Sequence, residues 1–347
     1  MQSAASPRGL RLRPHAKTHK SPVIARQQID RCSVGICCAK LGEADVFADA
    51  GITDIRIPYP LNPVNASRVF ALAERTNLSF IVDDLDVARA WSAIAARERR
   101  VLDVLVKVDV GFHRCGIDPE SPAAASTVAQ IASMPGLRFR GLLSHAGHAY
   151  GATSEREVAA IAAAEARLLR DLADASGVPC EEISVGSTPT ARFSLQHAGL
   201  TELRPGNYAY FDRTQVSLGS ATLDDCALTV LARVVSRPAT DRVILDSGSK
   251  MLTSDGARGF SSAAGYGVVL RDLDSAEPDP ALLIERLSEE HATVRAFGDA
   301  AMRTIGSLVR IVPNHSCVVS NLVDEVWLVD GERVIDTLPV AARGRTT

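Results

Sequence analysis

The first two thirds of the chain alternate between short runs of β-forming residues and longer, alanine-rich amphipathic segments. Each intervening segment is long enough for the crossover helix that joins two neighbouring parallel strands. Eight such alternations favour a (β/α)8 barrel, with a doubly wound α/β sheet or two unrelated domains as alternatives. The expected strands cover residues 12–17, 35–40, 54–60, 78–84, 102–110, 139–145, 181–187 and 202–211.

The rest of the chain, from about residue 220, has a different pattern. Short apolar runs such as ALTVLARVVSR and EVWLVDG are separated by turn residues, which is typical of an antiparallel β domain. Only PALLIERLSEEHA (280–292) resembles a helix, and CVVSNL (317–322) is expected to be extended. A chain of 347 residues exceeds the usual size of a single core. We therefore expect a barrel over residues 1–222 and a β-rich domain over 223–347.

Composition and charge exclude several classes of partner. The net charge of −3 gives no electrostatic reason to expect nucleic acid or an anionic membrane surface. No stretch approaches the ~18 uncharged apolar residues of a membrane span, and the N-terminus lacks the pattern of a secretory signal. The seven cysteines are odd in number and scattered, which favours reduced thiols. These features predict a cytoplasmic protein that acts on a small molecule.

The segment RLRPHAKTHKS (11–21) places Lys17 at the carboxyl end of the first expected strand. In a barrel of this kind, that end of the strands carries the active site. A lysine there can act as a Schiff-base nucleophile, because nearby cations or burial lower the pKa of its amine. His15, His19 and Lys20 are neighbours able to have this effect. A solvated basic arm is the alternative interpretation, since most lysines are exposed.

Two glycine-containing loops, VGSTPT and RPGNYAYFD, follow the last two expected strands. Glycine allows close backbone approach, and hydroxyl groups with free backbone N–H groups suit an anion such as phosphate. Either loop alone is typical of an ordinary turn. Because this architecture often places a phosphate site after its last two strands, the pair predicts one here. The candidate residues are Gly186, Ser187, Thr188, Gly206, Asn207 and Tyr208.

Two further loops carry polar side chains at strand ends. KVDVGFHRCG presents Arg114, whose guanidinium can hydrogen-bond a cofactor oxygen or a substrate carboxylate bidentately. SHAGHAYG presents His145, His148 and Tyr150, which are candidate acid, base or stacking groups. A surface arginine and satisfied core polar residues are the alternatives.

The motif PNHSC in the β-rich part contains His315 and Cys317, two residues apart. In an extended segment such residues point to the same face, so the imidazole and the thiolate can bind one cation together. Two protein ligands leave coordination positions open, as in a catalytic site, and a thiolate beside an imidazole favours zinc. A buried cysteine beside a turn histidine is the alternative.

Together these motifs resemble the family of D-threonine aldolase and eukaryotic-type D-serine dehydratase, pyridoxal phosphate (PLP) enzymes with an alanine racemase-like fold. The resemblance runs from about residue 11 to the ARG near the C-terminus. RPHAKTHKS resembles the family's cofactor-lysine motif, which implies Lys17 rather than Lys20. VGSTPT and RPGNYAYFD resemble the phosphate-binding loop and the loop after it, LDSGSK (245–250) a segment of the β domain, and PNHSC the metal site.

The resemblance implies a PLP- and metal-dependent lyase that acts on D-3-hydroxy-amino acids. Lys17, Arg114, His145 and Tyr150 are then expected to bind PLP together with the two phosphate loops. Cys317 favours elimination of water to a keto acid and ammonia, as in D-serine dehydratase. Cleavage to glycine and an aldehyde, as in D-threonine aldolase, is the alternative. An amino-acid racemase and a non-catalytic PLP-binding protein are less favoured.

The resemblance also implies a metal and a second subunit. Zinc is expected at His315 and Cys317, with manganese or magnesium as alternatives, where it holds the β-hydroxyl of the substrate. This motif lies far along the chain from Lys17, so either the domains fold back on one another or a partner subunit completes the site; a homodimer is expected. Family members begin somewhat earlier, so an N-terminal strand and part of the first helix are expected to be missing.

Overall fold

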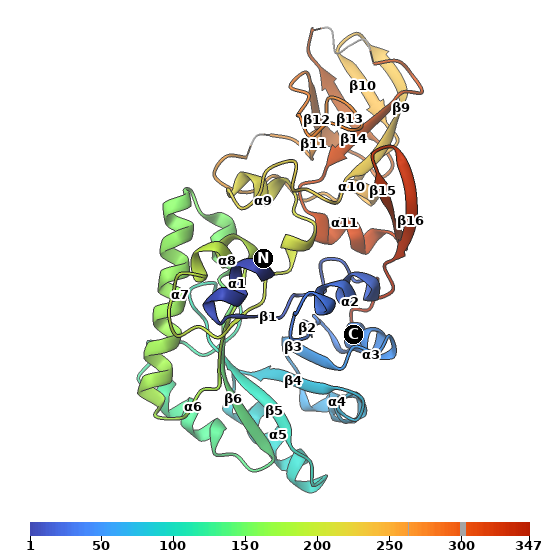
Figure 1. Cartoon of the computed structure of the whole chain (residues 1–347). Coiled ribbons are helices and arrows are strands. Elements are labelled where there is room, and N and C mark those ends of the chain that lie inside the picture. The colour runs from blue at the N-terminus through green and yellow to red at the C-terminus, as the bar shows by residue number, and fades with distance from the viewer. Residues whose placement is uncertain (263, 299–302) are drawn as a thin grey trace.

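The computed structural model describes residues 1–262, 264–298 and 303–347, and Figure 1 shows a barrel below a β-sheet domain. Eight parallel strands are hydrogen-bonded in the order β1-β8-β7-β6-β5-β4-β3-β2. Backbone bonds from Val34 N to Leu12 O (2.9 Å) and from Cys37 N to Pro14 O (2.7 Å) join β1 to β2, so the strands form a ring. The predicted barrel is confirmed. The strands are β1 Arg11–Leu12, β2 Ile36–Cys37, β3 Asp54–Pro60, β4 Asn77–Val82, β5 Leu102–Lys107, β6 Leu137–Leu143, β7 Glu182–Val185 and β8 Glu202–Leu203.

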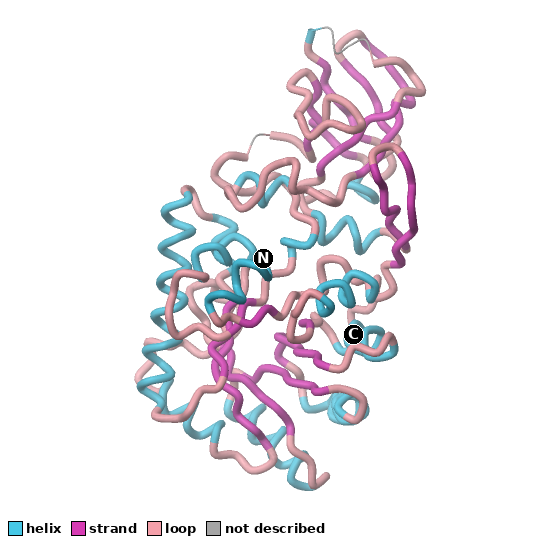
Figure 2. The backbone as a smooth tube through the Cα atoms, in the orientation of Figure 1, coloured by secondary structure: helices cyan, strands magenta, loops and turns pink. Residues whose placement is uncertain are grey.

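Helices cover the outside of the barrel (Figure 2). The boundaries of the longest one follow from sequence, because the Ser154 hydroxyl accepts from Glu157 N at its start and Gly177 adopts a left-handed conformation (φ 63°) at its end. The helices of this part are α1 Gln2–Ala5, α2 Pro22–Asp30, α3 Leu41–Asp49, α4 Ala66–Ala73, α5 Leu85–Arg97, α6 Ala124–Ala132, α7 Glu155–Ser176, α8 Thr188–Ser194 and α9 Arg213–Ser217. No helix in the described ranges combines the length and apolar character needed to cross a membrane.

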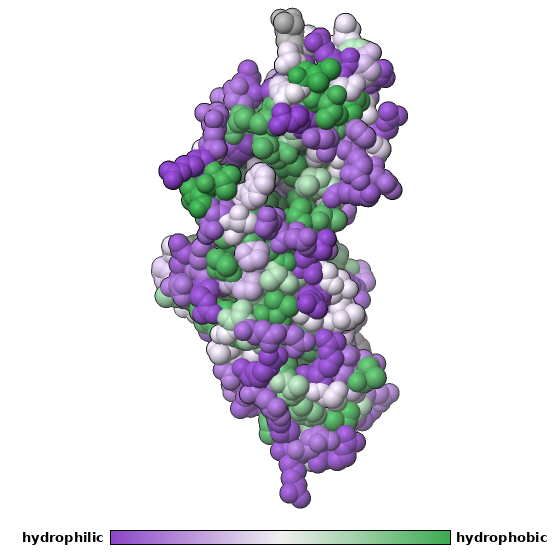
Figure 3. Space-filling model, turned by 90° about the vertical axis from the view of Figure 1, so that its right-hand side faces the viewer, coloured by the Kyte–Doolittle hydropathy of each residue, from purple (hydrophilic) through white to green (hydrophobic). Residues whose placement is uncertain are grey.

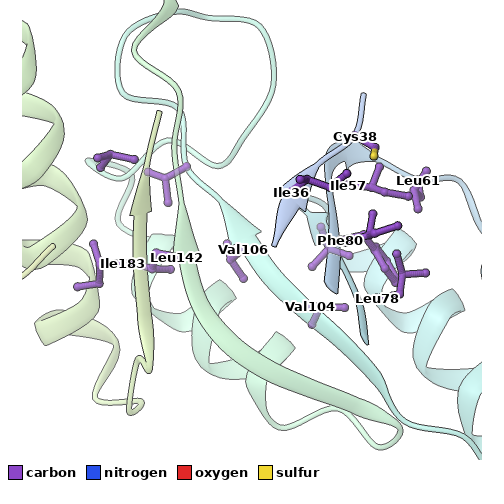
Figure 4. Close-up of a cluster of buried hydrophobic side chains, with 14 of the residues drawn as sticks. Ile36, Cys38, Ile57, Leu61, Leu78, Phe80, Val104, Val106, Leu142 and Ile183 are labelled. Carbon is purple, nitrogen blue, oxygen red and sulfur yellow. The ribbon is translucent and has the colours of Figure 1, made fainter. Parts of the chain in front are cut away.

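The barrel core lies between the strands and these helices. Ile36, Ile57, Phe80 and Val104 are completely buried, and Figure 4 shows them along neighbouring strands. Successive strand residues point to opposite faces, so the positions between them face the barrel interior. The apolar residues there form a small separate cluster of Ile81, Leu105 and Leu143.

Charged side chains occupy the interior at the N-terminal end of the barrel. Arg56 donates to Glu202 (2.5 Å) and to Glu182 (2.8 Å), and Arg13 donates to Glu202 (2.8 Å). Burial alone would raise the pKa of Glu202, but Arg56 and Arg13 outweigh it and hold that pKa at about 2. This end of the barrel is therefore closed by a paired ion network.

The C-terminal part is a six-stranded sheet in the order β11-β14-β9-β10-β13-β12, with a separate β15–β16 hairpin. Its pairings are antiparallel, as predicted. Its elements are β9 Val230–Ala239, β10 Arg242–Leu245, α10 Ser249–Leu252, β11 Val268–Val269, β12 Leu282–Leu287, β13 Ala292–Ala296, β14 Leu308–Val312, α11 Ser316–Leu322, β15 Glu325–Asp330 and β16 Arg333–Pro339.

Two local predictions in this domain are wrong. Residues 280–292 form β12 and the turn into β13 instead of a helix, because Leu282 and Ile284 alternate into the core and pair with β13. Residues 317–322 belong to α11 instead of a strand. The carboxylate of Asp212 accepts from Ser316 N (3.0 Å) at the start of α11, so a contact distant in sequence overrides the β-branched Val318 and Val319.

The chain returns to the barrel at its C-terminus, which lies beside α3 in Figure 1. Ala342 N donates to Lys20 O (3.0 Å), and Gly42 N donates to Thr347 O (2.7 Å). Ala342 is completely buried and packs in the barrel core. The last residues thus hold the segment after β1, which carries Lys17, from one side.

Candidate active site

A cavity of about 800 Å³ lies at the C-terminal end of the barrel strands, where the β domain faces them. Barrel residues such as Lys17 and Ser187 line it together with His315 and Cys317 of the β domain. Thr18 Oγ1 lies 3.2 Å from Cys317 Sγ, and Ser320 donates to Thr18 O (2.5 Å). Of the two arrangements left open by the sequence, the domains of one chain fold back on one another and bring these motifs together.

Lys17 and Lys20 differ completely in environment. Lys17 is exposed, lies in the turn after β1 and lines the cavity. Lys20 is buried, and its amine forms an ion pair with Glu43 (2.7 Å) and donates to Ala342 O (3.4 Å). In the part of the chain that the structure describes, no acceptor is bound to the Lys17 amine. Of these two lysines, Lys17 is the one free to react.

The first predicted phosphate loop presents unsatisfied hydroxyl groups to the cavity. Ser187 and Thr188 line it, and their buried hydroxyl oxygens have no hydrogen-bond partner among the described residues. Gly186 packs against Arg204, where a Cβ would come within 3.2 Å of that side chain. Buried polar groups without partners are rare and indicate a missing ligand or water. This loop fits the phosphate of a bound cofactor.

The second loop approaches the lysine turn closely. A Cβ on Gly206 would lie 2.9 Å from Thr18 Oγ1, so only glycine fits there. Asn207 lines the cavity with its buried Oδ1 unpaired, while its Nδ2 donates to Asp212 (2.6 Å). Tyr208 is not among the cavity-lining residues, and its hydroxyl accepts from Gln28 (3.1 Å). The loop brings two of its three candidates to the site.

Arg114, His145 and Tyr150 all line the cavity. The Arg114 guanidinium lies over the ring of Phe112 at 5.0 Å and makes no ion pair within the described residues. His145 Nδ1 is 2.5 Å from Gly186 O, and burial, followed by the charge of Lys17, lowers its pKa well below the usual value. The lowered pKa favours the neutral form of the His145 imidazole. The Tyr150 hydroxyl accepts from Gln215 (3.3 Å).

His315 and Cys317 lie together at the junction of the two domains. His315 is extended and immediately precedes α11, while Cys317 is in its first turn, so the expected extended geometry is wrong although both side chains line the cavity. Burial raises the pKa of the Cys317 thiol, but the hydrogen bond and charge of His315 outweigh it, and the pKa is lowered. His315 Nδ1 lies 2.5 Å from Asp255 Oδ2, the kind of contact that orients a metal-binding histidine.

A thiol with a lowered pKa beside an oriented imidazole fits a soft divalent metal such as zinc. Across the described ranges, no group of three or more His, Cys, Asp or Glu side chains is placed to hold one ion. The pair therefore offers two protein ligands and leaves the other coordination positions to substrate or water.

Several residues of the site were not singled out from sequence. Arg204 is buried in the cavity wall and donates to Ser184 Oγ (2.7 Å); it stands two positions before Gly206, so strand periodicity gives a signal for it. Lys107 is a charged residue within an apolar strand, and burial lowers its pKa to about 7. Asp255 and Arg258 come from an unremarkable loop, and sequence offers no signal for them.

The comparisons with known proteins agree with this site. Residues 1–214 match the family model for the alanine racemase N-terminal domain, and residues 227–329 match that of a serine dehydratase domain. The chain is 34% identical to a D-threonine aldolase from Arthrobacter sp over 99% of its length and 88% of that protein. The chain belongs to the family of D-threonine aldolases and D-serine dehydratases. It is a PLP-dependent lyase by family.

Other relatives show both activities and the same fold. D-threo-3-hydroxyaspartate dehydratase from Delftia sp. (strain HT23) is 33% identical over 91% of the chain and 86% of that protein. Its solved structure has a TM-score of 0.90 at 30% identity, covering 97% of this chain and 92% of that one. The D-threonine aldolase structure from Filomicrobium marinum has a TM-score of 0.88 at 32% identity, covering 100% and 92%.

Proposed function

We propose that this family member binds PLP and a divalent metal and eliminates water from a D-3-hydroxy-amino acid, giving a keto acid and ammonia. The observation that carries the proposal is that the Lys17 amine and the His315–Cys317 pair open into one cavity. PLP withdraws electrons from the Cα of a bound amino acid and so makes its proton removable.

The chain supplies binding on one side of the cavity and proton transfer in its centre. Ser187, Thr188, Gly206 and Asn207 hold the phosphate, supported by the unpaired hydroxyls and the close approach of Gly206. Lys17 attaches the cofactor and removes the Cα proton of the substrate. Arg114, His145 and Tyr150 line the same cavity, where Arg114 would donate to a cofactor oxygen and the other two would contact the cofactor. Tyr208 supports its loop from outside the cavity.

The β domain acts on the leaving oxygen. His315 and Cys317 hold zinc, with manganese and magnesium as alternatives, and Asp255 fixes the His315 ring. A metal held by these two side chains would supply a Lewis acid to the leaving oxygen of the substrate. The resemblance of the His-Ser-Cys motif to that of the dehydratases favours elimination over carbon–carbon cleavage. The 34% identity to a D-threonine aldolase keeps cleavage to glycine and an aldehyde as the second candidate.

One product assay tests the proposal. The protein is incubated with PLP, zinc or manganese, and D-serine, D-threonine or 3-hydroxy-D-aspartate in turn, and keto acid is measured against glycine plus aldehyde. Keto acid with ammonia is expected; glycine with aldehyde would establish the second candidate instead. Exhaustive chelation should abolish turnover and added metal restore it, so full activity after chelation contradicts the roles of His315 and Cys317.

We also infer that the protein is a cytoplasmic homodimer. An exposed apolar surface supports the dimer. Among the described residues the β15–β16 hairpin is not hydrogen-bonded to either larger sheet, and Trp327, Val329, Val334 and Ile335 are 50–60% exposed on it. Figure 3 views the molecule from the side that carries this hairpin and shows apolar patches among polar ones. Exposed apolar patches of this kind mark association surfaces. Sedimentation of Trp327→Glu should show a shift from dimer toward monomer.

A further inference from the structure

Arg258 is an exposed cation on the wall of the cavity. It lies in the segment between α10 and β11 and lines the cavity from the β-domain side. Within the described residues it makes no hydrogen bond and no ion pair. Arg204, by contrast, is bound to Ser184 Oγ and Ser144 O in the same wall. A guanidinium left without an acceptor beside a substrate cavity is available for a ligand anion.

The position of Arg258 relative to His315 and Cys317 indicates which part of a substrate its guanidinium can bind. A small recess beside the cavity is lined by Arg258 and His315 together, with Tyr150 and the carboxylates of Asp212 and Asp255. Burial raises the pKa of Tyr150 and the charge of Arg258 opposes that rise, which agrees with their proximity. Arg258 is thus adjacent to the group that holds the β-oxygen of the substrate, on the side of the cavity that the β domain forms.

The charge of the cavity also favours an anionic substrate. Its lining includes five basic side chains and neither an aspartate nor a glutamate; they are Lys17, Lys107, Arg114, Arg204 and Arg258. Lys107 carries only part of a charge at pH 7, because burial lowers its pKa to about 7, and the carboxylates of Asp212 and Asp255 line the adjoining recess. A cavity lined by one sign of charge raises the local concentration of oppositely charged ligands. Of these five, Arg258 is the one that also lines the recess beside His315.

We propose that Arg258 binds a second carboxylate, carried on Cβ of the substrate, and so selects dicarboxylic D-3-hydroxy-amino acids of the 3-hydroxy-D-aspartate class over D-serine and D-threonine. The inference rests on the proposed function, because it takes the β-oxygen to lie at His315 and Cys317. The other substituent on that carbon then faces the side of the main cavity that Arg258 lines. A bidentate carboxylate–guanidinium pair supplies the discrimination, since a methyl group or hydrogen at the same place leaves the guanidinium unpaired.

Steady-state kinetics of the PLP- and metal-loaded protein test the proposal with two substrates, 3-hydroxy-D-aspartate and D-threonine. In Arg258→Met, kcat/KM for 3-hydroxy-D-aspartate should fall about 10- to 100-fold, mainly through KM, while that for D-threonine changes by less than about threefold. Arg258→Lys should recover part of the loss. Arg295→Met is the matched control, because Arg295 pairs with Glu285 on the same domain, outside the cavity lining, and both substrates should be unaffected.

A binding measurement separates this proposal from the proposed function. Calorimetry with the unreactive anions malate and lactate should show tighter binding of malate to the wild-type protein, and Arg258→Met should remove that preference. If the wild-type protein turns over neither substrate but keeps the malate preference, the lyase assignment fails and the Arg258 site stands. Equal losses on both substrates would assign Arg258 to the α-carboxylate and overturn the proposal, as would no loss on either.

Discussion

The two ends of the barrel contain similar polar residues in opposite states. At the N-terminal end, Arg13 and Arg56 are buried and paired with Glu182 and Glu202. At the C-terminal end, the described residues leave Lys17 and the hydroxyls of Ser187 and Thr188 without a partner. A buried polar group that is paired contributes to specificity and folding, whereas one that is unpaired costs stability until a ligand binds. The pairing of polar side chains therefore distinguishes the end of the barrel that maintains the fold from the end that binds a ligand.

The largest expected effect comes from removing the unpaired amine. Lys17→Ala should lower turnover at least about 10³-fold, because the amine both attaches the cofactor and moves the Cα proton. The free energy of unfolding should hardly change, since the side chain is exposed to the cavity. Steady-state assays, PLP absorbance and denaturant unfolding measure the three properties on one sample.

Lys20→Met is the control for this experiment. It removes a lysine three residues away whose amine is paired with the buried Glu43. Leaving that carboxylate unpaired should cost about 3–5 kcal/mol of stability, while the PLP absorbance band is retained. If the PLP band is lost in Lys20→Met and retained in Lys17→Ala, Lys20 and not Lys17 attaches the cofactor. The contrast between a paired and an unpaired lysine would then not identify the reactive one.

A substitution at the N-terminal end of the barrel, where the charges are paired, should lower stability and leave activity unchanged. Arg56→Met leaves Glu182 and Glu202 buried with one fewer cation, and should destabilise the protein by about 3–5 kcal/mol. The activity per folded molecule at saturating substrate should be unchanged, because Arg56 does not line the cavity. Chemical denaturation and kcat corrected for the folded fraction provide the measurement. A fall in kcat with unchanged stability would contradict the division between the two ends.

The pH dependence of this variant sharpens the test. The pKa of Glu202 is about 2 in the folded protein, below its unfolded value, so its ion pairs stabilise the protein above the unfolded pKa. That stability is lost as the pH falls through the folded pKa. The difference between wild type and Arg56→Met should therefore be full at pH 7 and shrink from about pH 4 toward pH 2. A difference that stays constant over this range would mean that packing, and not charge, accounts for it.

The sequence predicts the barrel well because its signal is local and repeated. Alternating strand and helix segments, and motifs at strand ends, are enough to bring Lys17, Arg114, His145 and the phosphate loops to one face. The wrong predictions fall in the β domain, where contacts distant in sequence decide. Asp212 caps α11 across the domain junction, and pairing with β13 makes a strand of residues 282–287.

The partners of the site were harder to find than its motifs. Asp255 contacts His315 from sixty residues away, and only the folded chain brings them together. Arg204 and Lys107 are signalled by charge at strand positions that face the interior, but their burial against Ser184 and Val108 is a tertiary property. Periodicity identifies the face of a strand on which a residue lies. Whether a buried polar side chain finds a hydrogen-bond or ion-pair partner depends on the whole ring of strands, and this property distinguishes the two ends of the barrel.

The smallest effect is expected for Thr188→Val, which should change the stability of the PLP-free and the PLP-bound protein in opposite directions. Thr188→Val removes a buried hydroxyl without a partner, so it should stabilise the PLP-free protein by up to about 1 kcal/mol. The same change should weaken PLP binding about 5- to 50-fold, because a phosphate contact is lost. Thr190→Val is the matched control: its hydroxyl donates to Ser187 O (3.4 Å) and does not line the main cavity, so stability should fall slightly and PLP affinity stay unchanged. Thermal melts with and without PLP measure both signs, and equal shifts in both variants would mean that the unpaired hydroxyl has no ligand.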